Sequence, residues 1–190
     1  MPNAFTTHVT NPETQYPQAW ERAGLVKLLV LDVDGVLTSG QVFIGADGKE
    51  SLKTFDIQDG LGIKLLEQCG IPTAVITGRN SKMVLARCEE LGIKHLHMGV
   101  ENKALALAEV LKTLGLSSKD CAVMGDDWPD LAMMKNAGLR VCPAQAHEAV
   151  KEFAHYVTTQ TGGSSAVRET CDLILKAQNH YEELLNKARL

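Results

Sequence analysis

Two acidic residues follow the apolar run Val26–Leu31 directly. Asp32 and Asp34 stand two positions apart, and Gly35 after them allows the chain to turn so that both carboxylates enter one site. Adjacent carboxylates cannot both ionise cheaply without a cation, and Mg²⁺ is a hard cation that prefers oxygen ligands. One carboxylate can then attack phosphorus while the other transfers a proton. The pair therefore indicates phosphoryl-transfer chemistry, although Asp is also common in turns and at helix N-caps.

A second acidic cluster follows the apolar run Ala122–Met124. It consists of Asp126, Asp127 and Asp130, with Pro129 between the last two. The alternative to a metal site is an acidic helix start, which the helix dipole favours and which tolerates an early proline. Three acids here, together with the earlier pair at another strand end, favour the metal site.

Two further polar residues stand between the acidic clusters. Thr77-Gly78-Arg79 follows the apolar run that ends at Ile76, where a hydroxyl and backbone N–H groups can hold phosphate oxygens. Lys103 stands at the start of a predicted helix and can supply positive charge. Taken alone, Lys103 is better interpreted as a solvated surface lysine.

Short apolar runs alternate with helical patterns along the chain. Strands are predicted at Val26–Leu31, Thr73–Ile76, His95–Met98, Ala122–Met124 and Arg140–Cys142. Helices are predicted at Leu61–Cys69, Ser81–Leu91, Lys103–Leu114, Asp130–Asn136, His147–Phe153 and Ala166–Leu175. This alternation is typical of an α/β fold with a mainly parallel sheet between two helical layers. Ligands of such sheets bind beyond the carboxyl ends of the strands, which is where the acidic clusters stand.

One stretch departs from the alternation. Gln41–Ile44 and Ser51–Phe55 flank a turn rich in glycine, which predicts a β-hairpin that overhangs the site as a flap. We expect residues 25–190 to form one domain that includes this hairpin 41–55 and a C-terminal tail 160–190. Residues 1–24 are polar, and we expect them to form a flexible N-terminal segment.

The composition argues against several classes of function. Hydrophobic residues make up 45% of the 190 residues and charged residues 22%, as in soluble globular proteins, and the net charge of −4 leaves no basic surface for nucleic acid. Apolar stretches such as Leu28–Leu31 are too short to cross a bilayer, and residues 1–20 lack the pattern of a signal peptide. The five cysteines are dispersed without a Cys-x-x-Cys pair, which favours reduced thiols and the cytoplasm.

Together and in this order, the motifs resemble those of the haloacid dehalogenase superfamily. Its phosphatases have Asp-x-Asp-x-x-x-Thr, a Thr or Ser after the second strand, a Lys, and a Gly-Asp-Asp cluster followed by another Asp. The match covers Val26–Asp130. The resemblance implies a three-layer, Rossmann-like fold and the hydrolysis of a phosphate ester.

The resemblance implies a catalytic role for four residues. Asp32 is the expected nucleophile and would form an aspartyl-phosphate. Asp34 would protonate the leaving oxygen and then deprotonate the attacking water. Thr77 and Lys103 would hold the transferring phosphoryl group, whose equatorial oxygens need positive charge in the transition state.

The resemblance also implies a magnesium site. Its ligands would be the carboxylates of Asp32 and Asp126 and the backbone carbonyl of Asp34, with Asp127 or Asp130 supporting them from nearby. Asp32 must stay anionic on the metal, whereas Asp34 must hold a proton when the ester bond breaks. Different surroundings for two neighbouring carboxylates allow one site to do both.

Most members of the superfamily have a separate cap domain, but the Gln41–Phe55 hairpin is too small to be one. The chain is similar to the capless phosphatases that act on 3-deoxy-D-manno-octulosonate 8-phosphate in the synthesis of a lipopolysaccharide sugar. This likeness extends over nearly the whole chain beyond Val26, including Gly162–Glu169. It implies a homotetrameric ring in which a neighbour's hairpin and C-terminal segment help to close each site against water.

The same resemblance implies a set of substrate-binding residues. They are Asp34, Asp56, Ile57, Gln58, Asp59, Gly60, Lys64, Arg79, Arg87, Lys103 and Arg168, and Arg168 would reach a neighbouring subunit's site. Gly162 and Gly163 are expected to form a hinge for a mobile tail, with a plain loop as the alternative. Gln58 and Lys64 stand where relatives have arginine and Ser165 where they have glycine, which leaves the substrate and the tail's mobility open.

Other functions compete with this interpretation. A nine-carbon acylneuraminate-type 9-phosphate phosphatase would share the capless scaffold. A non-catalytic scaffold for oligomerisation or phosphosugar sensing is the alternative from another class. The intact Asp32, Asp34, Lys103 and Asp126 argue against that scaffold. A phosphomutase is disfavoured because transfer within one sugar generally needs the water exclusion of a cap.

Overall fold

A six-stranded parallel sheet forms the centre of the molecule. The structure, a computed structural model, describes residues 12–190. The strand order is β5-β4-β1-β6-β7-β8, and each neighbouring pair is parallel. The strands are β1 (Leu28–Leu31), β4 (Thr73–Ile76), β5 (His95–His97), β6 (Cys121–Met124), β7 (Leu139–Cys142) and β8 (Tyr156–Val157). The predicted parallel α/β fold is confirmed.

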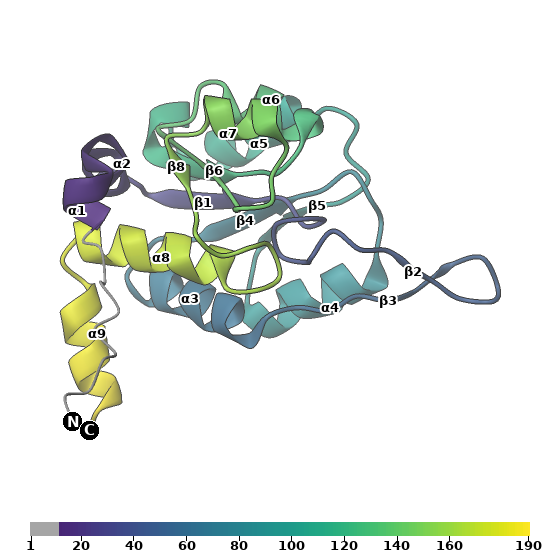
Figure 1. Cartoon of the computed structure of the whole chain (residues 1–190), viewed down its shortest axis with the longest axis horizontal. Helices are drawn as coiled ribbons and strands as arrows, with labels where there is room; N and C mark the ends of the chain where they lie inside the picture. The colour runs from purple at the N-terminus through teal and green to yellow at the C-terminus, as the bar shows by residue number, and fades with distance from the viewer. Residues whose placement is uncertain (1–11) are drawn as a thin grey trace, which may run out of the picture.

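Helices cover both faces of this sheet (Figure 1). One layer contains α3 (Ile57–Gln68), α4 (Lys82–Leu91) and α8 (Ala166–Ala177), with α2 (Pro17–Ala23) beside α8. The other contains α5 (Lys103–Leu114), α6 (Trp128–Met134) and α7 (Glu148–Phe153). The shorter elements are α1 (Pro12–Gln15), a 3₁₀ turn at Ser118–Asp120 and α9 (Tyr181–Ala188).

The apolar strands explain why both faces are covered. All four residues of β1 are buried, and successive side chains point to opposite faces of a sheet. Leu29 and Leu31 therefore join the core beneath α3, α4 and α8, whereas Leu28 and Val30 join the core beneath α5, α6 and α7. Strands buried on both faces read as continuous apolar runs, which is why the sequence revealed them.

The N-terminal boundary differs from the sequence-based expectation. Helix α2 lies within the segment that we expected to be flexible, and Ala19 and Ala23 on this helix are buried in the core. The packed part of the domain therefore begins before residue 25. Short helices whose buried face is alanine leave no clear apolar period. Residues 1–11 of the expected flexible segment lie outside the described residues.

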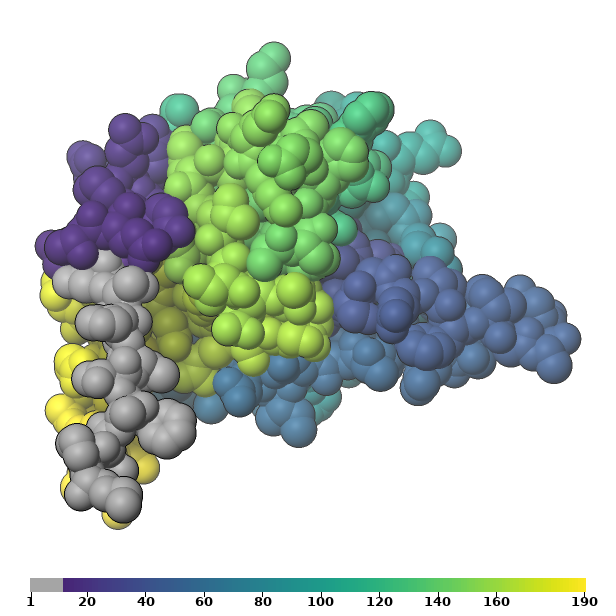
Figure 2. Space-filling model, in the orientation of Figure 1, coloured from purple at the N-terminus to yellow at the C-terminus, as the bar shows by residue number. Residues whose placement is uncertain are grey.

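The predicted hairpin is present between β1 and α3. It consists of β2 (Phe43–Ile44) and β3 (Glu50–Leu52), paired antiparallel around a turn. Both of its strands are largely exposed, and the hairpin projects from the body of the molecule (Figure 2). Its base lies beside the carboxyl end of the sheet, as expected of a flap.

Two other expectations can be compared with the structure. All five cysteines are free, as their spacing predicted. Among residues 12–190, every helix is too short or too polar to cross a bilayer.

Candidate active site

Asp32, Lys103 and Asp130 form a buried charged cluster at the carboxyl end of the sheet. Asp32 follows β1, the central strand, and its backbone N–H donates to the carbonyl of Met124 in β6 (3.1 Å). The Lys103 ammonium donates to Asp32 Oδ1 at 2.6 Å and to Asp130 Oδ1 at 2.7 Å. All three side chains are almost inaccessible to solvent. Lys103 is therefore not a solvated surface residue.

Asp126 completes this cluster from the end of β6. Carboxylate oxygens of Asp32, Asp126 and Asp130 all lie within 4.8 Å of one another. The other oxygen of Asp130 accepts hydrogen bonds from the backbone N–H groups of Asp126 (2.9 Å) and Asp127 (3.3 Å). Asp127 is exposed and caps α6, so Asp130 and not Asp127 belongs to the cluster.

Glycine is required where the two acidic loops meet. Gly35 has a φ of 92°, and a Cβ at this residue would lie 2.0 Å from Asp126 Oδ2. The backbone of the turn after Asp34 therefore lies in close contact with the Asp126 carboxylate. The first and second sequence motifs meet through this contact.

Burial and mutual repulsion raise the proton affinity of the cluster. Burial, followed by the negative charge of Asp130, raises the pKa of Asp32 to about 6 despite the opposing Lys103. Burial and the charges of Asp32, Asp130 and Asp127 raise the pKa of Asp126 to about 7. Burial alone would lower the pKa of Lys103, but the charges of Asp32 and Asp130 raise it. Three oxygen donors that repel one another fit Mg²⁺, whose charge favours their ionised forms.

The carboxylate of Asp34 lies apart from the cluster and faces the hairpin. Lys53, directly after β3, forms an ion pair with it, and Arg79 Nε lies 4.0 Å from Asp34 Oδ2. Lys53 also pairs with Glu50 (2.9 Å). The sequence did not predict a role for Lys53 and Glu50. No local motif distinguishes the buried Lys53 from the exposed charged residues of the same hairpin.

The two threonines of the motifs are both buried but have different surroundings. Thr77 follows β4, the strand beside β1, and its hydroxyl accepts from the backbone N–H of Arg79 (3.4 Å). Thr38 donates to the carbonyl of Val33 (3.2 Å) and accepts from the N–H groups of Gly35 (3.4 Å) and Gly40 (3.3 Å). Thr38 therefore fixes the turn that contains Asp34.

The start of α3 contains four of the predicted substrate residues. Asp59 and Gly60 are buried, unlike the exposed Ile57 and Gln58. Asp59 Oδ1 accepts from the N–H of Arg168 (2.7 Å), and a Cβ at Gly60 would lie 2.4 Å from an Arg87 nitrogen. Asp59 and Gly60 thus lie where α8 and α4 pack against α3. Burial raises the pKa of Asp59 to about 6.

The remaining predicted substrate residues surround α3. Asp56 caps this helix by accepting from the N–H groups of Gln58 (2.5 Å) and Asp59 (3.2 Å). Arg87 donates to the carbonyl of Asp56 (3.0 Å) and pairs with Glu90 at 2.8 Å. Two further residues are Lys64, which is exposed on α3, and Arg168, which pairs with Asp172 (2.8 Å).

The start of the C-terminal tail (residues 160–190) lies directly on the turn formed by residues 33–38, which we call the catalytic turn. The Gln145 side chain donates to the carbonyl of Gly35 (2.6 Å) and accepts from the N–H of Gly162 (2.8 Å). A Cβ at Gly162 would lie 1.9 Å from the Gly35 oxygen, and Gly163, at a φ of 67°, donates to the carbonyl of Val36 (3.1 Å). Close approach therefore accounts for both glycines. Sequence reasoning missed Gln145.

Ser165 gives a test of backbone strain in this segment. Its φ is 71°, which an L side chain tolerates poorly, while its hydroxyl donates to Asp56 (3.2 Å). Ser165→Ala keeps the strain and loses the hydrogen bond, whereas Ser165→Gly loses both. We expect the free energy of unfolding of Ser165→Gly to exceed that of Ser165→Ala by about 1 kcal/mol in urea titrations. Equal stabilities would contradict strain at this residue.

Comparisons with known proteins agree with this geometry. Residues 97–169 match the family model of the haloacid dehalogenase-like hydrolases. The 3-deoxy-D-manno-octulosonate 8-phosphate phosphatase KdsC of Salmonella typhimurium is 43% identical over 167 residues, which is 88% of each chain.

Two solved structures have the same fold. The crystal structure of the 3-deoxy-D-manno-octulosonate 8-phosphate phosphatase of Yersinia pestis has a TM-score of 0.84 and 44% identity, over 87% of this chain and 89% of that one. The Moraxella catarrhalis phosphatase, solved with magnesium, phosphate and KDO, has a TM-score of 0.86 and 43% identity, over 90% and 97% of the chains. The chain thus belongs to the haloacid dehalogenase-like hydrolases and, within them, to the family of the 3-deoxy-D-manno-octulosonate 8-phosphate phosphatases.

Proposed function

We propose that this chain hydrolyses 3-deoxy-D-manno-octulosonate 8-phosphate to the free sugar acid and phosphate, with Mg²⁺ and an aspartyl-phosphate on Asp32. The observation that supports this most strongly is the buried cluster in which Lys103 bridges Asp32 and Asp130 beside Asp126. Membership of a family whose relatives are named for this substrate supports the choice of ester.

The cluster is suited to phosphoryl transfer. Asp32 would attack phosphorus, and the Lys103 ammonium beside it would offset charge on the phosphoryl oxygens. Bound Mg²⁺ would supply further positive charge there. Asp34 lies outside the buried cluster, is partly exposed, and can give a proton to the leaving oxygen and later accept one from water. Thr77 and the N–H groups after it would hold the phosphate.

Several substrate residues remain part of this proposal. Arg79 is exposed beside Asp34 and would meet an anionic substrate at the mouth of the site. Ile57, Gln58 and Lys64 present exposed side chains in the N-terminal part of α3. Asp59 and Gly60 at the start of the same helix are buried and stay in the proposed set.

The test of the substrate is a comparison of phosphate release from three kinds of ester. We expect a strong preference for 3-deoxy-D-manno-octulosonate 8-phosphate over a nine-carbon acid 9-phosphate and over hexose phosphates, with Mg²⁺ required. Activity on another ester alone would keep the mechanism and refute the substrate. No turnover of any ester by folded protein with Mg²⁺ would support the non-catalytic scaffold.

We also propose a homotetramer in the cytoplasm. Val42, Phe43, Ile44 and Leu52 on the hairpin are large apolar side chains with at least 40% exposure. Apolar groups gathered on a projecting element favour burial against another subunit. The five free thiols favour a reducing compartment. Analytical ultracentrifugation tests the assembly, and a monomer at micromolar concentration would refute it.

A further inference from the structure

Four alternating charges join the hairpin to the catalytic turn. Lys53 pairs with Asp34 and with Glu50 (2.9 Å), while Arg79 lies 3.5 Å from Glu50 and 4.0 Å from Asp34. Glu50 and Lys53 belong to the hairpin. Asp34 and Arg79 belong to the loops after β1 and β4. Two of the four pairs, Lys53–Asp34 and Arg79–Glu50, therefore cross from the hairpin to these loops.

Burial identifies the centre of this network. The Lys53 side chain is 1% exposed, compared with 12% for Glu50, 23% for Asp34 and 47% for Arg79. A buried ammonium without partners is strongly unfavourable, so Lys53 depends on its two carboxylates. Burial alone would lower the pKa of Lys53, but the hydrogen bonds that its ammonium donates to Asp34 and Glu50 raise it. Lys53 is therefore a fixed cation behind the partly exposed Asp34.

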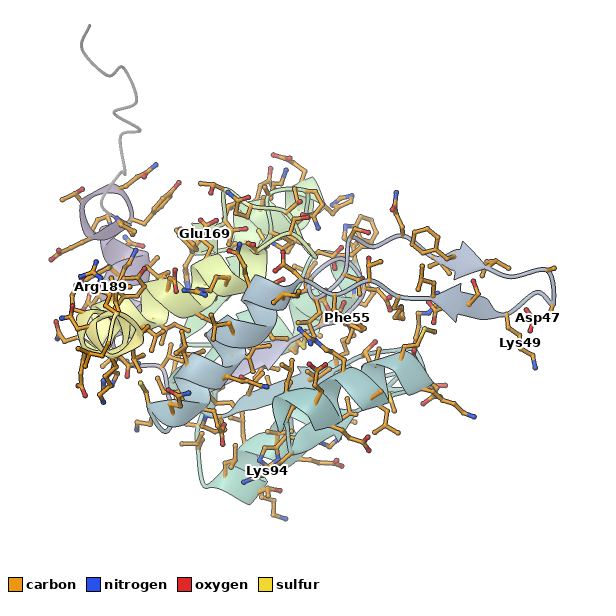
Figure 3. The ribbon with its side chains drawn as sticks, turned by 90° about the horizontal axis from the view of Figure 1, so that it is seen from below. Asp47, Lys49, Phe55, Lys94, Glu169 and Arg189 are labelled. Atoms are coloured by element: carbon orange, nitrogen blue, oxygen red, sulfur yellow. The ribbon has the colours of Figure 1, made fainter. Side chains whose placement is uncertain are left out.

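The rest of the hairpin gives Asp34 no comparable support. Its strands are two and three residues long and largely exposed, and its tip, with Asp47 and Lys49, projects far from the sheet (Figure 3). Phe55 marks the base, where the chain returns to the core. Within residues 12–190, the Asp34 carboxylate forms ion pairs with Lys53 and Arg79.

We propose that Lys53 is a positioning residue that holds the Asp34 carboxylate in place for proton transfer to the leaving oxygen. This inference rests on the proposed function, in which Asp34 is the general acid. It makes the base of the hairpin part of the active site of its own subunit. The position of the hairpin then affects catalysis through Lys53. This effect is separate from any contact that the hairpin makes with a neighbouring subunit.

The inference predicts a dependence on the leaving group. A sugar alkoxide is a poor leaving group and needs a proton, whereas dinitrophenolate leaves without one. The ratio kcat/KM reports the steps up to release of the first product, and therefore excludes the later hydrolysis of the aspartyl-phosphate. A loss confined to kcat/KM for the sugar ester thus identifies a fault in proton donation. A general structural defect would lower kcat/KM for the sugar ester and for the aryl ester to the same extent.

The experiment compares Lys53→Met with Lys49→Met on the sugar ester and on dinitrophenyl phosphate. Lys49 is an exposed lysine at the tip of the same hairpin. We expect Lys53→Met to lower kcat/KM for the sugar ester about 10–100-fold, with a much smaller effect on the aryl ester. Lys49→Met should leave both values unchanged, and Lys53→Arg should restore part of the loss. Equal losses on both esters, or no loss on the sugar ester, would refute the inference.

A further variant, Asp34→Asn, tests the role of Lys53 separately from the proposed role of Asp34 as general acid. Asp34→Asn must show the same selective loss, and more strongly. If it does not, the assignment of Asp34 as general acid fails together with the inference. If Asp34→Asn shows the selective loss and Lys53→Met does not, only the role of Lys53 fails. Should Lys53→Met not fold in thermal melts, Lys53→Gln, which keeps a polar side chain at this buried position, takes its place with the same expected result.

Discussion

Asp32→Asn is expected to lower kcat at least about 10³-fold while leaving the protein folded. The amide has the shape of the carboxylate but cannot attack phosphorus. It also removes one of three crowded acids, so the fold gains from weaker repulsion even as Lys103 loses an ionic partner. Steady-state phosphate release and a thermal melt on the same preparation are the measurements.

The matched control is Asp47→Asn at the exposed tip of the hairpin, where Asp47 accepts from the backbone N–H of Lys49. This variant makes the same chemical change away from the cluster and should retain full activity. Substantial turnover by Asp32→Asn would assign the nucleophile to another group. Loss of activity in both variants would point to a general defect.

Asp126→Asn is expected to stabilise the metal-free protein and to remove its stabilisation by Mg²⁺. Burial and three neighbouring acids oppose ionisation of Asp126 in the folded state. A neutral amide escapes this cost, but it is a poorer ligand. At Mg²⁺ concentrations about 100 times the dissociation constant, binding would add about 2.7 kcal/mol to the wild-type free energy of unfolding. Melts with chelator and with Mg²⁺ measure both effects.

Asp127→Asn is the control, because Asn caps a helix as well as Asp does and Asp127 lies outside the cluster. It should keep the wild-type response to Mg²⁺. The stability advantage of metal-free Asp126→Asn should grow between about pH 4 and pH 7, because wild-type Asp126 has a pKa of about 7 when folded and 3.8 as reference. Comparison with the variant cancels His155, whose lowered pKa of about 4 has the opposite effect. An advantage that shrinks with pH would contradict the raised pKa.

The sequence predicted those strands and helices that have a clear apolar pattern of their own. Strand β4 and helix α5 have the bounds predicted for them, because a run buried on both faces and a glycine-ended amphipathic helix are local patterns. Strand β8 and helix α9 were missed. The first has two residues, and the second has no buried residue, so neither leaves a strong apolar signal.

The site was predictable where motifs are local. Asp32, Asp126 and Lys103 meet because each follows or begins an element at the same edge of the sheet. Lys53 and Gln145 were not predictable, since their contacts depend on how the hairpin and the C-terminal segment return to the catalytic turn. The burial of Asp59 was not predictable for a related reason, because it depends on the packing of α8 against α3.

The most direct test of the central claim is to trap the phosphoryl group on Asp32. Asp34→Asn protein mixed with dinitrophenyl phosphate should form the aspartyl-phosphate, since this ester needs no proton, and should hydrolyse it slowly without the general base. Acid quenching and peptide mass spectrometry should then find one phosphoryl group on the peptide that contains Asp32, and none when Asp32→Asn is added to the variant. Release of dinitrophenolate without that phosphopeptide, or with phosphate on another residue, would contradict Asp32 as the nucleophile.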